Sequence, residues 1–123
     1  MTIADTDVCI DYLAGKGETD AVQQLLRRGA LRTTVIGRFE LLSGARNPVQ
    51  LALLVQLLGA VPALDLDGAA ADAASEVRRS LERSGNGIGM ADSLIAGIVT
   101  RNGGALLTRN RRHFERVPGI RLA

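Results

Sequence analysis

The stretch from residue 3 to residue 13, IADTDVCIDYL, places three carboxylates in a segment that is otherwise apolar enough for a protein core. Residues 2–4 are typical of a short buried strand, and apolar residues recur at helical spacing over 7–14. Asp5 therefore stands where a strand passes into a helix. Such a unit is the beginning of an α/β fold, provided that it repeats along the chain.

Strand-like segments do alternate with helical patterns. The expected strands are 2–4, 31–33, 61–66, 105–107 and 120–122. The expected helices are 7–14, 19–28, 35–44, 48–58, 68–84 and 90–101. Asp67 or Gly68 is typical of a helix start, and Asn102-Gly103-Gly104 of a helix end. Because strands separated by helices imply right-handed crossovers, we predict one three-layer α/β/α domain over residues 1–123, with a central, mostly parallel sheet of about five strands.

Length and composition are those of a single domain without a membrane segment. The chain has 123 residues, of which 46% are hydrophobic, enough for a sizeable core. It contains no uninterrupted apolar run of about 18 residues and no signal-peptide pattern at its start. Its single cysteine, Cys9, lies in an apolar helical pattern and has no partner for an intramolecular disulfide. These features predict a cytoplasmic protein with a buried thiol and no association with membranes.

Arginine accounts for 14 of the 15 basic residues, although the formal net charge is only +2. A planar guanidinium suits phosphate oxygens because it donates two parallel hydrogen bonds. The pairs at 27–28 and 78–79 are typical of solvated helix faces, whereas Arg109, Arg111 and Arg112 follow a predicted strand. We predict that these three contact the phosphates of a nucleic acid. Aromatic residues, at 2% of the chain, are too few for base stacking to be the main contact.

The ligand crevice of a parallel α/β sheet lies beyond the carboxyl ends of the strands, and Asp5 is predicted to stand there. Asp7 falls in the first turn of the next helix, where a negative charge suits the helix dipole. Asp11 lies one turn further on and is expected to be solvated. A second interpretation makes Asp5 an ordinary helix N-cap, a position that aspartate favours.

Two further acids occupy helical positions that should be apolar. In TTVIGRFELLSGA, Phe39 and Leu42 lie on an apolar stripe, and Glu40 lies at its margin. In GIGMADSLIAGIV, Asp92 falls on the apolar side of the helix. A carboxylate on a buried face is costly unless it is paired, hydrogen-bonded or bound to a metal. Considered singly, Glu40 suits a salt bridge with an arginine, and Asp92 suits a helix cap or an ion pair.

Together, Asp5, Glu40 and Asp92 supply the oxygen ligands that a hard divalent cation such as Mg²⁺ prefers. One histidine and one cysteine are too few for a zinc site. A magnesium ion at the strand ends can orient water for attack on a phosphodiester and neutralise the charge that builds on the phosphorus oxygens. The three acids therefore predict hydrolysis of a nucleic-acid backbone.

Four blocks, in order, resemble the PIN-domain ribonucleases, and among them the toxins of VapBC-type toxin–antitoxin modules. The blocks are IADTDVCIDYL, TTVIGRFELLSGA, GIGMADSLIAGIV and LLTRNRRHFERVPGIRL. The resemblance implies an endoribonuclease that depends on Mg²⁺ or Mn²⁺, cuts structured RNA at exposed loops, is usually a homodimer, and is held inactive by a cognate antitoxin. It also implies a set of site residues. The catalytic and metal-binding residues are Asp5, Asp92 and Glu40, the last able to act through water, and the supporting residues are Thr6 and Asp7.

Three positions depart from the family pattern. Asp7 stands where the family often has asparagine, so the site carries additional negative charge. Asn110 falls where many members have a fourth acid, and His113 falls where an aspartate is common. An asparagine can still hold a water or a phosphate through its amide, so Asn110 is kept as a catalytic candidate. His113, beside two arginines, is more typical of a surface residue than of a general acid.

Two other functions are compatible with parts of the sequence. Asp5-Thr6-Asp7-Val8 matches the DxD motif of haloacid-dehalogenase-like phosphatases, but such an enzyme needs a lysine beside the phosphate, and Lys16 is the single lysine. A PIN-like binding module that lost catalysis with the change to Asn110 is the second alternative. The turn SGNGIG, residues 84–89, does not match a phosphate-binding glycine pattern and is typical of an interhelical loop.

The segment QLALLVQLLGAVPAL, residues 50–64, is apolar around most of its helical part. A surface helix of a monomer rarely has that pattern. We therefore expect part of this segment to form a homodimer contact or a groove for the antitoxin, in the helix-in-groove mode.

Overall fold

The computed structural model describes all 123 residues and contains one five-stranded sheet. Every pair of neighbouring strands is parallel, and the spatial order is β3-β2-β1-β4-β5. The strands are β1 (Thr2–Ala4), β2 (Leu31–Thr34), β3 (Ala63–Leu64), β4 (Ala105–Leu107) and β5 (Arg121–Leu122). The predicted parallel sheet is confirmed, and Asp5 directly follows its central strand.

Seven helices accompany the strands. They are α1 (Thr6–Leu13), α2 (Thr19–Arg27), α3 (Val35–Ser43), α4 (Pro48–Ala60), α5 (Gly68–Arg83), α6 (Met90–Asn102) and α7 (Arg111–Phe114). The first six match predicted helices. α7 is absent from the prediction because a single turn is too short to show a hydrophobic period. The strand predicted over 61–66 shrinks to β3, because Val61 ends α4 and Pro62 has no N–H to donate to a ladder.

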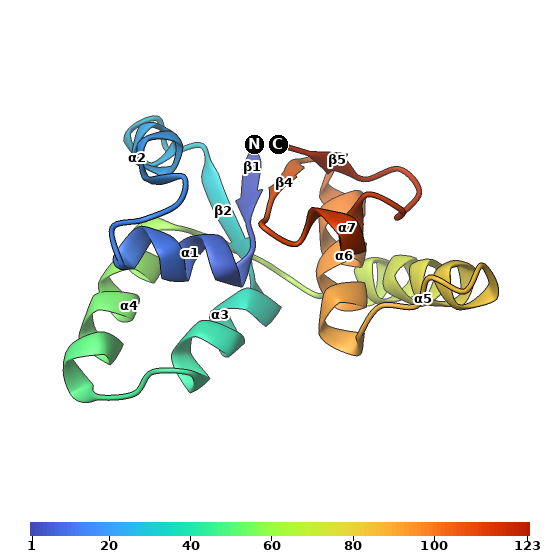
Figure 1. Cartoon of the computed structure of the whole chain (residues 1–123), viewed down its shortest axis with the longest axis horizontal. Coiled ribbons are helices and arrows are strands. Elements are labelled where there is room, and N and C mark those ends of the chain that lie inside the picture. Colours follow the sequence, from blue (N-terminus) through green and yellow to red (C-terminus); the bar gives the residue numbers. More distant parts are fainter.

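Helices cover both faces of the sheet (Figure 1). α1 to α4 lie on one side, and α5 to α7 lie on the other. Successive residues of a strand point to opposite faces, and β1 follows this rule: Ala4 packs with Val8 and Leu54, whereas Ile3 packs with Ile95. The sheet thus separates two hydrophobic clusters, and the predicted three-layer α/β/α arrangement is confirmed.

Polar caps place the starts of several helices at the carboxyl edge of the sheet. Asp5 caps α1 directly after β1, and Thr34, the last residue of β2, caps α3. Asp67 begins α5, as predicted, and accepts a hydrogen bond from the Ala70 N–H at 2.8 Å. Since β1 and β2 are parallel neighbours, α1 and α3 begin at the same edge of the sheet. The cap residues Asp5 and Thr34 consequently share that edge.

The buried face of α3 differs from the predicted apolar stripe. Phe39, predicted on that stripe, is 69% exposed, and Leu41 is buried instead. Leu41 belongs to the cluster formed with α1 and α4. A helix that is apolar on more than one side does not specify its buried face by period alone, so the neighbouring helices select it.

α5 packs closely against α6 at Gly97. A Cβ atom at this position would lie 2.6 Å from both the carbonyl oxygen of Ala70 and the backbone nitrogen of Ala74. Only glycine permits such an approach. α6 ends at Gly103, whose φ of 74° lies in the left-handed region, as predicted from its sequence. The contact at Gly97 holds α6, and with it the first turn that carries Asp92.

α4 has apolar residues on both its buried and its exposed sides. It buries Leu54, Leu57 and Leu58. Its exposed aliphatic residues are Val49, Leu51, Leu53 and Val55. The predicted apolar surface is therefore present. Neither α4 nor any other helix is long and apolar enough to cross a membrane.

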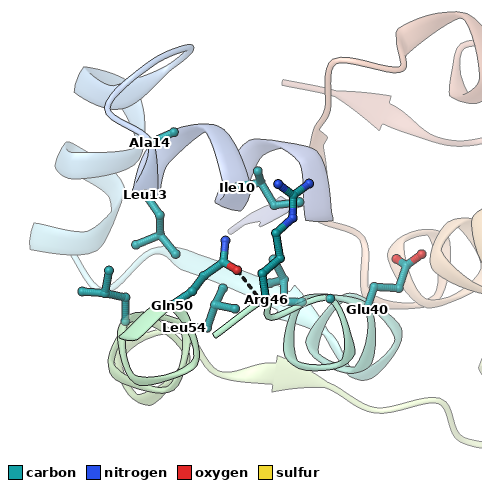
Figure 2. A pocket seen from close by; sticks show the side chains of 10 residues that line it. Ile10, Leu13, Ala14, Glu40, Arg46, Gln50 and Leu54 are labelled. Atoms are coloured by element: carbon teal, nitrogen blue, oxygen red, sulfur yellow. Dashed lines mark hydrogen bonds between the residues drawn. The ribbon is translucent and has the colours of Figure 1, made fainter. Parts of the chain in front are cut away.

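A groove of about 320 Å³ lies between α1, α3 and α4 (Figure 2). Its lining is mostly apolar and includes Ile10 and Leu13 from α1 and Leu53 from α4. Glu40 and Arg46 add charged atoms to its wall. Leu53 belongs both to this groove and to the exposed side of α4, so the two form one continuous apolar surface.

Candidate active site

Asp5 is held by two hydrogen bonds at the carboxyl end of β1. Its Oδ1 accepts from the backbone N–H of Thr6 at 2.9 Å, and its Oδ2 accepts from the hydroxyl of Thr108 at 2.8 Å. Ala4 pairs with Leu107 in the parallel ladder, so the next residue of each strand lies side by side. The same carboxylate caps α1. Asp5 is therefore the N-cap of α1 and also stands at the carboxyl end of β1, where the crevice is predicted.

Thr108 is a site residue that the sequence analysis missed. Its side chain is buried, and its hydroxyl both donates to Asp5 and accepts from the Asn110 N–H at 3.0 Å. Its signal in the sequence was a hydroxyl residue directly after a strand, at the position equivalent to Asp5. That signal has meaning only when β4 is known to lie beside β1.

Burial raises the pKa of Asp5 from 3.8 to about 6. The negative charges of Asp7 and Asp92 also raise this pKa. Hydrogen bonds from Thr108 and Thr6 act in the opposite direction and lower it. The ionised carboxylate therefore has a free-energy cost in the folded protein, and a nearby positive charge would offset that cost.

Glu40 reaches the same edge of the sheet from α3. Its Oε1 accepts a hydrogen bond of 2.8 Å from the hydroxyl of Thr6, whose N–H donates to Asp5. Thr6 thus links the two acids, and its supporting role in the site stays a prediction. Glu40 forms no ion pair with an arginine, so the salt bridge considered for it is absent.

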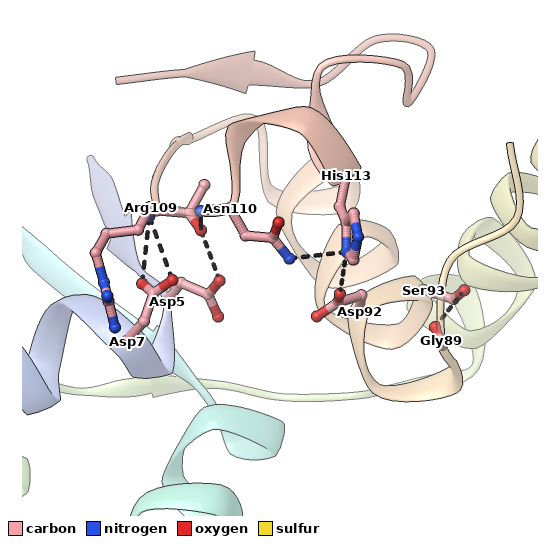
Figure 3. Close-up of polar contacts among 9 residues, drawn as sticks. Asp5, Asp7, Gly89, Asp92, Ser93, Arg109, Asn110 and His113 are labelled. Carbon is pink, nitrogen blue, oxygen red and sulfur yellow. Dashed lines mark hydrogen bonds and ion pairs between the residues drawn. The ribbon is translucent and has the colours of Figure 1, made fainter.

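Asp92 lies in the first turn of α6 and pairs with His113 of α7. Its Oδ2 is 3.1 Å from the Nδ1 of His113, and the same Nδ1 is 2.7 Å from the amide of Asn110. The N-cap of α6 is Gly89, so the cap interpretation of Asp92 does not hold. The contact with His113 is a hydrogen bond, and it is an ion pair only when the imidazole is protonated. Figure 3 shows the carboxylates of Asp92 and Asp5 pointing toward one another across the space beside Asn110.

Asp11 is not solvated, and that prediction is wrong. It is 8% exposed, and its Oδ2 forms an ion pair of 3.0 Å with the Nε of Arg109. Asp7, one turn earlier, accepts a hydrogen bond from the backbone N–H of Arg109 at 3.3 Å. Residues four apart share a helix face, so Asp7 and Asp11 lie on the same side of α1. Both carboxylates contact Arg109, because the pairing of β4 with β1 places the segment after β4 beside this face.

The predicted phosphate-binding arginines are distributed around this segment. Arg109 contacts Asp11 but keeps 65% of its side chain exposed. The guanidinium of Arg111 donates to the carbonyl oxygen of Ala123 at 2.8 Å, and so holds the last strand. Arg112 is exposed and forms no ion pair. Arg109 and Arg112 are consequently the better placed of the three to meet an anion, and RNA binding by this group stays a prediction.

Cys9 is buried, as predicted. Burial, together with the charges of Asp5 and Asp7, raises the pKa of its thiol to about 12. A thiol in this state is not a nucleophile near neutral pH. Cys9 is therefore a core residue of α1 with no part in the chemistry of the site.

The donors at this edge fit a hard cation by type, since they are carboxylate oxygens. No group of three or more His, Cys, Asp or Glu side chains lies close enough together to hold a metal ion as placed. Asp5 and Asp92 do face one another (Figure 3), and the charge of Asp92 acts on the pKa of Asp5. The structure thus turns the carboxylates of Asp5 and Asp92 toward one another (Figure 3) and links Glu40 to Asp5 through Thr6. The three-carboxylate metal site stays a prediction.

The chain matches a known protein family and two characterised relatives. The PIN-domain family model matches residues 2–120. The chain is 31% identical over 121 residues to the tRNA(fMet)-specific endonuclease VapC of Shigella flexneri, covering 95% of this chain and 92% of that protein. It is 32% identical over 122 residues to the protein of the same name from Salmonella typhimurium strain LT2, covering 96% and 92%.

Solved structures share the fold over nearly the whole chain. DNA-bound VapBC from Salmonella typhimurium has a TM-score of 0.89 and 31% identity, covering 99% of this chain and 96% of that chain. VapBC2 from Rickettsia felis, bound to a fragment of its promoter, has a TM-score of 0.85 over the same shares of the two chains. At 20% identity, the second similarity concerns the fold alone.

Proposed function

Since the chain belongs to the PIN-domain family and, within it, to the VapC toxins of type II toxin–antitoxin modules, we propose that its strand-end acids hydrolyse RNA with a bound Mg²⁺ or Mn²⁺ ion. It is an endoribonuclease with a cognate antitoxin. The metal, the roles of individual residues and a single nuclease domain over residues 1–123 are our proposal.

One observation carries the assignment of the site. Asp5 is ionisable, buried and turned toward Asp92 (Figure 3), and its pKa is raised to about 6. A helix cap alone would not require the two further negative charges, Asp7 and Asp92, that lie near Asp5. A metal-dependent site for phosphodiester hydrolysis requires such charges, because the same negative charges that destabilise the metal-free protein bind the cation.

Each acid is held by a different partner. Thr108 and Thr6 orient Asp5, and Thr6 also donates to Glu40. We assign metal binding to Asp5 and Asp92, with Glu40 acting through water. When bound, Mg²⁺ or Mn²⁺ supplies positive charge to the phosphate oxygens and lowers the pKa of a water molecule. Asn110 and the exposed part of Arg109 offer N–H donors to the phosphate, which positions the backbone for in-line attack.

The substrate that we propose is a tRNA, in the first place tRNA(fMet). Two VapC relatives carry that specificity in their names and share 31–32% identity with this chain. Single-stranded loops of structured RNA expose their backbone to a cleft in a way that a helix does not. The near absence of exposed aromatic residues, apart from Phe39, favours a grip on backbone and shape over base stacking.

The apolar surface of α4 and its groove is our proposed contact for the antitoxin or for a second copy of the chain. Four aliphatic residues of α4 are exposed, and the groove beside them is open to a helix or an extended segment. Burying such a surface is favourable by about 25 cal/mol per Å² of apolar area. The groove also ends at Glu40 (Figure 2), so an occupant would lie next to the acid site.

The test compares the purified protein with Asp92→Asn on tRNA(fMet) and on total RNA, with Mg²⁺, with Mn²⁺ and with EDTA. We expect cleavage by the parent that requires the metal, and no cleavage by the variant. Thermal melts of both proteins accompany the assay, because Mg²⁺ should raise the melting temperature of the parent more than that of the variant. Cleavage that persists in EDTA, or in Asp92→Asn, would contradict the metal assignment. Absence of cleavage by the parent under every condition would favour a binding module without catalysis.

A further inference from the structure

We propose that His113 is a positioning residue, which holds the Asp92 carboxylate in the orientation that the cleavage site requires. The inference rests on the proposed function, since it deepens the description of the same site. It also changes the interpretation of His113, which the sequence places among surface residues.

His113 is the single hydrogen-bonding partner of the Asp92 side chain. Its Nδ1 lies 3.1 Å from Asp92 Oδ2, and no other side chain or backbone group donates to this carboxylate. The carboxylate of Asp5, in comparison, has a donor at each oxygen. Asp92 therefore depends on one residue for its orientation, and that residue comes from a different helix, 21 positions later in the chain.

The contact with Asp92 decides where the imidazole carries its proton. A carboxylate can only accept, so Nδ1 must carry the hydrogen that is donated to Asp92. The Asn110 atom that lies 2.7 Å from Nδ1 is the amide nitrogen (Figure 3). A protonated Nδ1 cannot accept from it, so we assign the amide oxygen to this position. The oxygen and nitrogen of an amide are assigned from such networks. In this arrangement Asn110 and Asp92 both accept from the N–H at Nδ1.

The consequence concerns the second oxygen of Asp92. His113 occupies Oδ2, while Figure 3 shows the other oxygen on the side of the carboxylate that faces Asp5. Without His113, the Asp92 carboxylate could rotate freely about its Cβ–Cγ bond. Repulsion between the two negative charges would then favour orientations in which Asp92 points away from Asp5. Residues that hydrogen-bond to a metal-binding carboxylate commonly tune metal affinity or activity by 10–100-fold. His113 is in the place to do so.

The chain permits a sharp set of variants. His113→Ala removes the donor. His113→Asn keeps an N–H donor attached to Cγ, which is where Nδ1 is attached in histidine. His113→Gln has the same amide one carbon further out, and so presents the donor in the wrong place. Glu115→Ala is the matched control, because Glu115 is exposed and its side chain forms no hydrogen bond or ion pair.

Two readouts are needed, and one of them does not involve catalysis. The affinity of the full chain for Mn²⁺ is measured without RNA, from the electron paramagnetic resonance signal of the free ion during a titration. Cleavage of tRNA is measured separately as kcat and KM. Thermal melts in EDTA verify that each variant is folded, which is expected because the side chain of His113 is 53% exposed.

We expect His113→Ala and His113→Gln to lose about 10–100-fold in Mn²⁺ affinity and a similar factor in kcat at saturating metal, with KM for RNA little changed. His113→Asn should recover most of both losses, and Glu115→Ala should match the parent. Equal Mn²⁺ affinity in the parent, His113→Ala and His113→Gln would overturn the proposal, as would a failure of asparagine to differ from alanine. A parent that binds Mn²⁺ but cuts no RNA would instead refute the proposed function.

Discussion

At the scale of single residues, Asp5 combines a structural and a chemical task in one carboxylate. Its oxygens cap α1 and bind Thr108, which stabilises the join between β1, β4 and the first helix. Its charge, in contrast, is unfavourable, because the group is buried and two other acids lie near it. The neutral carboxyl group of Asp5 favours the folded state, whereas the charged form is the one that we propose binds a metal. The free energy of unfolding should therefore depend on pH.

We predict that Asp5→Asn stabilises the metal-free protein near neutral pH. The carboxyl group ionises near 3.8 when unfolded and near 6 when folded, so the folded state loses free energy as the pH rises through this interval. The whole penalty is present above about 6, and none of it below the unfolded value. A pKa difference of about two corresponds to roughly 3 kcal/mol of unfolding free energy. Asparagine replaces the hydrogen bonds of Asp5 with Thr6 and Thr108 imperfectly, so we expect the variant to be more stable by about 1–3 kcal/mol.

Urea unfolding in EDTA at the two ends of this pH interval measures the effect. The variant should exceed the parent in free energy of unfolding at neutral pH, and the difference should vanish or reverse in acid. An identical difference at both pH values would mean that the charge of Asp5 is not the cause.

At the scale of elements, the proposed site uses helices from both sides of the sheet, including α3, which carries Glu40. α1 follows β1 and brings Asp5 and Asp7, whereas α6 brings Asp92 from the far side of the sheet. The position of α6 is set by its contact with α5, where Gly97 lies against Ala70 and Ala74. This contact contains no catalytic group, yet it decides where one of the acids stands.

We predict that Gly97→Ala destabilises the protein by about 1–3 kcal/mol, because the added methyl group overlaps backbone atoms that cannot move freely. Gly59→Ala in α4 is the matched control. It has nothing within 4 Å of the added Cβ atom and should be neutral or stabilising by up to about 1 kcal/mol through helix propensity. Thermal or urea unfolding of both variants measures the contrast. Two variants with the same change in stability would indicate that α5 can shift away from α6 at little cost.

α4 supports a second prediction at this scale, concerning association. Leu53 is 47% exposed and lies in the groove as well as on the apolar side of α4. Leu53→Glu should leave the melting temperature of the isolated chain within a few degrees of the parent, since the residue is not in the core. It should weaken the homodimer or the complex with the antitoxin at least tenfold, because a charge would be buried at the contact.

Light scattering on the isolated chain and a pull-down with the antitoxin from its own operon distinguish the two partners. Unchanged mass and unchanged antitoxin binding would remove this surface from consideration.

At the scale of the whole molecule, charge is arranged unevenly. The formal net charge is +2, but acids gather at the carboxyl edge of the sheet and arginines surround the segment after β4. An RNA that approaches this edge meets both. We therefore expect the arginines to attract the RNA backbone and a bound cation to offset the charge of the acids.

We predict that Arg112→Ala lowers RNA affinity and reduces the slope of log K against log salt concentration by about one, as expected for the loss of a single phosphate contact. Arg112 is the clearest choice because Arg111 also holds Ala123 and Arg109 also pairs with Asp11. Arg28→Ala, on the exposed end of α2, is the control and should leave the slope unchanged. Filter binding at several salt concentrations, in EDTA to prevent cleavage, supplies the slopes. If Arg112→Ala does not alter the slope of log K against log salt concentration, Arg112 does not contact a phosphate and is only a solvent-exposed residue.

The sequence by itself determined the elements and their order. Six helices and five strands follow from hydrophobic period and from caps such as Asp67 and Gly103, because these signals act over a few residues. The parallel sheet follows as well, since a strand–helix alternation leaves few other arrangements. Asp5 could be placed at the strand end for the same reason. α7 lay beyond this reach because a single turn is too brief to show a period, and the strand predicted over 61–66 is longer than β3.

Only the tertiary structure decided which side chains meet. Thr108 binds Asp5 across 103 positions of sequence because β4 lies beside β1, and Asp11 is paired because Arg109 arrives over α1. His113 touches Asp92 because α7 comes to rest against the start of α6. Strand order and register depend on the summed packing of two hydrophobic clusters on either side of the sheet. No local pattern contains that sum, so the partners of each acid were decided by the fold as a whole.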